Sequence, residues 1–211
     1  MTLSGLIKGN LNLQMVQMRV THNSRINGVS YRNSTIATID ENGTVIARRF
    51  SNGKVEIIGV HYSPANINGK CVCVTEEGNI LTGTSDGSLT CLTNDCGKTN
   101  WKIGAHKGAV TCLFSSPNYL LSGGEDCVVR IWAPNSRQLI NQISVHQKTI
   151  RRVLGDYKYP HIIHSVSEDK SIHAYDMKSD KKISFRQAAS GILTSMDQSL
   201  STGDLGKPSI I

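Results

Sequence analysis

The sequence contains little proline, few aromatic side chains and no long apolar run. Among 211 residues there are 5 prolines and 2 tryptophans, and the apolar stretches are no longer than a strand. A membrane-spanning helix needs about 20 consecutive apolar residues, so we expect no membrane insertion. Alanine and glutamate are sparse beside valine, isoleucine, threonine and serine, and this balance does not favour a helical fold.

Acidic residues are in the minority. The chain has 16 Asp and Glu against 23 Lys and Arg, a net charge of +7, and its 38% of hydrophobic residues is enough for a core. A basic balance favours acidic partners without choosing among nucleic acid, an anionic membrane surface and an acidic protein face. No basic cluster alternates with aromatic residues, so nucleic acid is the weaker interpretation. We interpret the basic pairs as solvated surface: Arg48 and Arg49, Arg151 and Arg152, Lys181 and Lys182.

The cysteines do not form a metal-binding pattern. Cys71 and Cys73 are one residue apart, which is not the spacing of a zinc knuckle, and no histidine follows at finger spacing. Because alternate residues of a strand share a face, we interpret both as small core residues. No apolar block suggests a secretory leader, so we expect a cytoplasmic protein without disulfides.

Catalytic signatures are also missing. The chain has no phosphate-binding loop of the Walker type, no H-E-x-x-H and no G-x-S-x-G. His161 and His164 are three apart in an expected strand, so they face opposite ways and do not share a metal. We therefore expect no enzymatic activity, no catalytic residue, no cofactor and no bound metal.

A hydroxyl residue recurs about every 40 residues, the period of a propeller blade. In the segments Leu81–Leu92, Leu121–Trp132 and His164–Asp176, a serine or threonine precedes a turn aspartate by four residues, and an alternating strand follows. In a fainter copy around Thr38, Asn42 takes the aspartate's place. The recurring hydroxyl residues are Ser4, Thr38, Thr82, Ser122, Ser165 and Thr202.

A histidine opens several of these units, and the order of residue types then resembles a known family. His22, His106 and His146 each precede an alternating strand, whereas the unit near Pro64 lacks the histidine. The order of histidine, strand, hydroxyl, turn aspartate and tryptophan resembles the WD-repeat β-propellers. The unit from Ala105 to Ala133 is the most similar, although alanine stands at both ends where the family usually has glycine and aspartate.

The resemblance implies an all-β propeller of four-stranded antiparallel blades, in one domain over residues 1–211. The expected units are 1–20 (partial), 21–62, 63–104, 105–144, 145–185 and 186–211 (partial). Both end units lack a strand, and three interpretations stay open: a piece of a larger ring, completion by another chain or a second copy, or an irregular five-bladed ring. Open strand edges associate readily, so we expect the isolated chain to aggregate.

The resemblance also implies a buried hydrogen-bonded set within each blade. It places His106, Ser122, Asp126 and Trp132 in one set, His146, Ser165, Asp169 and Tyr175 in a second, and Thr82 and Asp86 in an incomplete third. Serine, histidine and aspartate together also occur in hydrolases, but here the trio repeats with the fold period. We therefore interpret these residues as structural, because a catalytic triad occurs once.

The resemblance implies a non-catalytic scaffold that binds several proteins at once within an assembly. The expected contact residues flank the turn aspartates and the histidine loops: Ser85, Lys102, Lys107, Glu125, Lys148, Glu168 and Lys170. The alternative is an architectural component of a ciliary or flagellar axoneme, located at the cytoskeleton, whose positive charge suits the acidic surface of tubulin.

Overall fold

The computed structural model describes residues 21–187, which form sixteen strands in four sheets and no helix. No described segment is therefore a helix that could cross a membrane. The hydroxyl positions at Ser4 and Thr202, the partial unit 1–20 and nearly all of the partial unit 186–211 lie outside the described residues.

Each sheet consists of four consecutive strands in antiparallel order, and we call these sheets blades 1 to 4. Blade 1 contains β1 (Ile26–Arg32), β2 (Thr35–Asp40), β3 (Val45–Ser51) and β4 (Lys54–His61). Blade 2 contains β5 (Gly69–Val74), β6 (Ile80–Thr84), β7 (Ser88–Leu92) and β8 (Thr99–Gly104). Blade 3 contains β9 (Val110–Ser115), β10 (Leu120–Gly124), β11 (Val129–Trp132) and β12 (Leu139–Ile143). Blade 4 contains β13 (Ile150–Gly155), β14 (Ile162–Ser167), β15 (Ser171–Asp176) and β16 (Lys181–Gln187).

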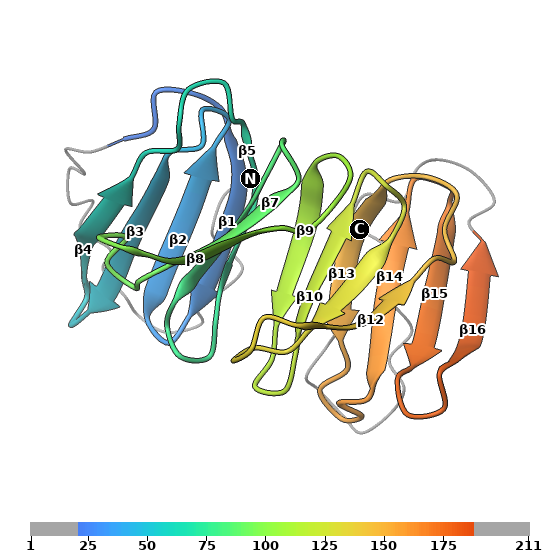
Figure 1. Cartoon of the computed structure of the whole chain (residues 1–211). Coiled ribbons are helices and arrows are strands. Elements are labelled where there is room, and N and C mark those ends of the chain that lie inside the picture. The colour runs from blue at the N-terminus through green and yellow to red at the C-terminus, as the bar shows by residue number, and fades with distance from the viewer. Residues whose placement is uncertain (1–20, 188–211) are drawn as a thin grey trace.

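The blades follow one another along the molecule, from blade 1 in blue to blade 4 in orange (Figure 1). Their first strands lie in series: β1 contacts β5, β5 contacts β9, and β9 contacts β13. Among the described residues, β1 and β13 make no comparable contact, so these four blades form an open arc. The expected all-β architecture of four-stranded antiparallel blades is confirmed, and each recurring hydroxyl residue of the described range lies in the second strand of its blade.

Apolar cores fill the spaces between neighbouring blades. Val72 and Val74 of β5 face blade 1, whereas Cys71 and Cys73 of the same strand face blade 3, as the alternation of a strand requires. Both cysteines are buried among apolar side chains, and so is Cys112 in the core between blades 3 and 4. The first strands, which we call the inner strands, therefore contribute to two cores at once in the middle blades, β5 in blade 2 and β9 in blade 3.

The alternating strand directions define two rims. The turns between the second and third strand of each blade, together with the connections between blades, lie on one rim, which we call the aspartate rim. The turns between the first and second and between the third and fourth strands lie on the other, which we call the hairpin rim.

The aspartate turns of blades 2 to 4 share one backbone geometry. The residue after the aspartate has a positive φ in each: 79° at Gly87, 64° at Cys127 and 69° at Lys170. Only glycine adopts this region without a steric penalty from Cβ. Blades 3 and 4 therefore carry local strain that blade 2 avoids.

We predict that Cys127→Gly raises the free energy of unfolding by about 0.5–1 kcal/mol, because it removes a Cβ from a left-handed position. The measurement is urea denaturation in dilute solution, followed by circular dichroism. Cys127→Ser is the matched control, since it also removes the thiol but keeps Cβ. An equal gain in both variants would contradict the backbone explanation.

Candidate functional site

In blade 3 a continuous chain of hydrogen bonds joins four side chains. Trp132 Nε1 donates to Ser122 Oγ over 2.9 Å, Ser122 Oγ lies 2.7 Å from His106 Nε2, and His106 Nδ1 lies 2.8 Å from Asp126 Oδ1. Because an ionised carboxylate can only accept, Nδ1 of a neutral His106 carries the hydrogen that it donates to Asp126, and Nε2 then accepts from the serine hydroxyl. The structure thus brings all four residues expected in this set together.

Asp126 is the last member of this series of hydrogen bonds, and two segments of the polypeptide meet at it. It accepts the backbone N–H of Lys107 over 3.1 Å and Arg130 Nη1 over 2.7 Å. Burial opposes the charge of this carboxyl, but the hydrogen bonds from Arg130, His106 and Lys107 outweigh burial and lower its pKa to about 2. The charged Asp126 therefore ties the loop that enters blade 3 to the turn within it.

His106 itself is best accommodated without a charge. Burial lowers its pKa from the usual 6.5, against the opposite effect of Asp126. A neutral ring can accept from Ser122 and donate to Asp126 at the same time, which a protonated ring cannot do.

Blade 4 repeats most of this arrangement. His146 Nε2 lies 2.8 Å from Ser165 Oγ, and His146 Nδ1 lies 3.1 Å from Asp169 Oδ2 and 2.9 Å from Ser171 Oγ. Asp169 also accepts the backbone N–H of Gln147 over 2.9 Å, and its pKa is lowered to about 2 by hydrogen bonds that outweigh burial. The loop entering blade 4 is thus held as in blade 3.

Tyr175 is not part of the set in blade 4, and this expectation from the sequence was wrong. Its hydroxyl donates to Asp180 in the following turn and accepts a long hydrogen bond from Asn141. The ring of His173 packs edge-on against His146 at a centroid distance of 4.6 Å and occupies the space beside it. The tyrosine is half-buried against the core between blades 3 and 4, but its hydroxyl bonds Asp180, whereas the indole of Trp132 in blade 3 bonds the serine.

Blade 1 contains an equivalent set made of different residues. His22 Nε2 lies 2.7 Å from Thr38 Oγ1, His22 Nδ1 lies 2.9 Å from Asp40 Oδ2, and Arg48 Nη1 donates to Thr38 Oγ1 over 3.0 Å. Asn42 does stand at the position of the turn aspartate, one residue before Gly43 with its φ of 77°, but Asp40 supplies the carboxylate that bonds the histidine. Arg48 is buried, so its interpretation as solvated surface was wrong.

Strand register explains why Arg48 and Asp40 take part in the set of blade 1. Ile36 faces Arg48 as Leu120 faces Trp132, so the arginine occupies the position of the tryptophan. The position of Asp40 is that of Gly124 in blade 3, where an added Cβ would lie 2.4 Å from His106 Nδ1. A carboxylate at this position is therefore aimed at the histidine. Asp40 lies two residues after the hydroxyl residue Thr38 instead of four, so the repeat pattern did not identify it.

Blade 2 lacks the histidine, and Thr82 and Asp86 are not brought together. Thr82 Oγ1 makes only a 3.5 Å contact with the carbonyl of Thr90. Asp86 instead binds within its own turn, to the hydroxyl of Thr84 at 2.6 Å and to the backbone N–H of Ser88 at 3.0 Å. These bonds outweigh burial and lower its pKa to about 2.

Four of the seven expected contact residues have their polar groups engaged within the chain. Ser85 Oγ accepts the N–H of Asn68, Lys102 pairs with Asp86 at 3.5 Å, Glu125 accepts the N–H of Ala109, and Glu168 pairs with Arg151. The remaining three are exposed, and among the described residues none forms a hydrogen bond or ion pair with their ammonium groups: Lys107, Lys148 and Lys170.

Comparison with known proteins agrees with this geometry. The family model described as "WD domain, G-beta repeat" matches residues 97–133, which contain the complete set of blade 3. Striatin-4 of Mus musculus is 32% identical over 106 residues, which are 49% of this chain and 13% of that protein. Striatin-3 of Rattus norvegicus is 32% identical over 81 residues, which are 37% of this chain and 10% of that protein.

The match therefore spans little more than a tenth of the length of these relatives. Among solved structures, the crystal structure of the computationally designed protein Ika4 has the same arrangement of chain, with a TM-score of 0.64 and 18% identity. The aligned region covers 74% of this chain and 94% of the Ika4 chain. At 18% identity, this similarity shows a shared fold alone.

We predict that Asp126→Asn lowers the free energy of unfolding by about 1–2 kcal/mol at neutral pH. The folded-state pKa of Asp126 lies below the usual 3.8, so its stabilising effect is present above about pH 4 and is lost as the pH falls toward 2. Urea denaturation of both chains at pH 7 and at about pH 3 measures this. The difference in free energy of unfolding between the unmodified chain and the variant should be smaller at the lower pH. A difference that does not change with pH would contradict the role of the charge.

Proposed function

We propose that this chain of WD repeats is a non-catalytic scaffold that holds several proteins at once within a larger assembly. The WD-repeat match and the similarity to striatins support a role in protein interaction. The serine, histidine and aspartate groups that resemble a triad serve the fold, since Ser122 Oγ is buried and bonded to Trp132 and His106. A hydroxyl held in this way is poorly placed to attack a substrate.

The observation that carries the proposal is the group of exposed lysines on the aspartate rim. The backbone of Lys107 is fixed by Asp126, and the carbonyl of Lys148 accepts the hydroxyl of Ser167 over 2.9 Å. Their side chains thus project from rigid points, together with that of Lys170, and none has a partner among the described residues. Such a rim favours an acidic partner segment, whose approach it accelerates and orients.

We expect Lys107→Glu combined with Lys148→Glu to weaken capture of acidic partners by about three- to tenfold without unfolding blade 3 or 4. The readout is quantitative pull-down with the full chain, beside the thermal melting curve of each variant. Lys54→Glu is the matched control, because Lys54 is an exposed lysine on the hairpin rim of blade 1. If the double variant captures every partner as well as the Lys54→Glu control does, this choice of rim is wrong.

The alternative, an architectural component bound to microtubules, draws on the same lysines and on the net charge of +7. Added salt shortens the screening length from about 8 Å at physiological ionic strength to about 3 Å at 1 M, so contacts of this kind weaken. We predict that any binding to microtubules in a cosedimentation assay declines steeply with added salt and with the double charge reversal. Pelleting that salt does not change, or no pelleting, would rule this alternative out.

A further inference from the structure

A pocket of about 180 Å³ lies between blades 2 and 3 on the hairpin rim, away from the lysines described above. The β5–β6 turn, the β9–β10 turn and the beginning of β8 surround it. Cofactor and drug-sized ligands occupy roughly 300–1,000 Å³, so this volume suits one long side chain rather than a small-molecule ligand.

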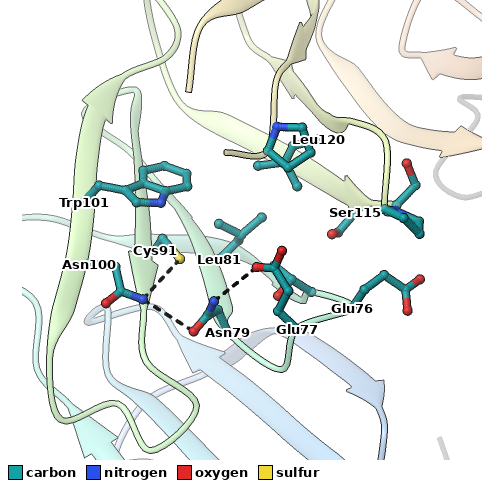
Figure 2. A pocket seen from close by; sticks show the side chains of 13 residues that line it. Glu76, Glu77, Asn79, Leu81, Cys91, Asn100, Trp101, Ser115 and Leu120 are labelled. Carbon is teal, nitrogen blue, oxygen red and sulfur yellow. Dashed lines mark hydrogen bonds between the residues drawn. The ribbon is translucent and has the colours of Figure 1, made fainter. Parts of the chain in front are cut away.

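The pocket combines apolar walls with an acidic edge. Leu81, Leu120 and Trp101 form its apolar part, and Glu76 and Glu77 line its edge. In Figure 2 the indole of Trp101 borders one side, Glu76 the opposite side, and Glu77 lies between them. No basic residue lines it, although the chain as a whole is strongly basic.

One of the two carboxylates, that of the exposed Glu77, has a hydrogen-bond partner but no cation beside it in the described part of the chain. Glu76 pairs with Arg32 of blade 1. Glu77 instead receives Asn79 Nδ2 over 3.4 Å, and Asn79 in turn receives Asn100 Nδ2 over 3.4 Å, a relay drawn in Figure 2. Glu77 thus keeps its negative charge uncompensated by a cation among the described residues.

We propose that this pocket holds the side chain of an arginine presented by a partner protein. The aliphatic part of an arginine packs against Leu81 and Leu120, as long basic side chains do on apolar surface. Its planar guanidinium stacks on Trp101 and donates to Glu77. Buried aromatic and arginine anchors of this kind dominate the free energy of protein interfaces.

The choice of arginine over lysine follows from geometry. The pocket offers an aromatic side chain and a carboxylate on different sides, and a guanidinium can stack through its face while its five N–H donors lie in one plane. An ammonium group is a compact charge that stays more strongly hydrated. This site lies on the rim opposite the lysines, so it holds whether or not they bind an acidic partner.

The test uses the full chain in dilute solution and the capped peptide acetyl-Gly-Arg-Gly-amide. We expect a saturable change in tryptophan emission, because Trp101 lines the pocket while the other tryptophan, Trp132, is buried in blade 3. The change should be lost in Trp101→Phe. It should be weaker with the lysine peptide and absent with the neutral citrulline peptide.

The charge of the pocket is tested with Glu77→Gln, which should weaken binding of the arginine peptide by about three- to fivefold. Glu56→Gln, an exposed carboxylate in β4, should leave it unchanged. An emission change that persists in Trp101→Phe, or no effect of Glu77→Gln, would overturn the proposal. Equal responses to arginine and lysine, or to arginine and citrulline, would overturn the choice of side chain.

Discussion

A buried imidazole with a hydroxyl on one ring nitrogen and a carboxylate on the other recurs in three of the four blades, at His22, His106 and His146. In blades 3 and 4 the carboxylate also binds the backbone just after the histidine, which joins the entering loop to the turn of the same blade. Because a buried polar group is tolerated only when its bonds are made, the loops have little freedom. The shape of the aspartate rim therefore depends on these buried rings.

The apolar interior is organised between blades rather than within them. Side chains of the inner strands alternate between two cores, so each middle blade is stabilised from both sides. In such an array the stability of one unit depends on its neighbours, as in other repeat folds. The polar sets and the shared cores are complementary, because the first fix the rim and the second fix the spacing of the sheets.

Periodicity in the sequence was sufficient to predict the sheets and much of blade 3. The hydroxyl residues and turn aspartates repeat along the chain, and local patterns of this kind are visible without coordinates. Asp40 and Arg48 were missed because they act through strand register, which places residues far apart in the chain opposite one another. Tyr175 has the register position of Trp132, but its hydroxyl bonds Asp180 and Asn141 rather than Ser165, and the repeat pattern does not reveal these partners. The pocket between blades 2 and 3 depends on how two sheets meet, and no single repeat contains that information.

The cysteines of the inner strands have a chemical consequence. Burial raises the pKa of Cys73 to about 11 and that of Cys112 to about 12, and it also raises the pKa of Cys71. Nucleophilic attack and oxidation require the thiolate, which these three sulfur atoms do not form near neutral pH. Burial among apolar side chains and a raised pKa both disfavour oxidation of these thiols, which protects the packing at the centre of the arc.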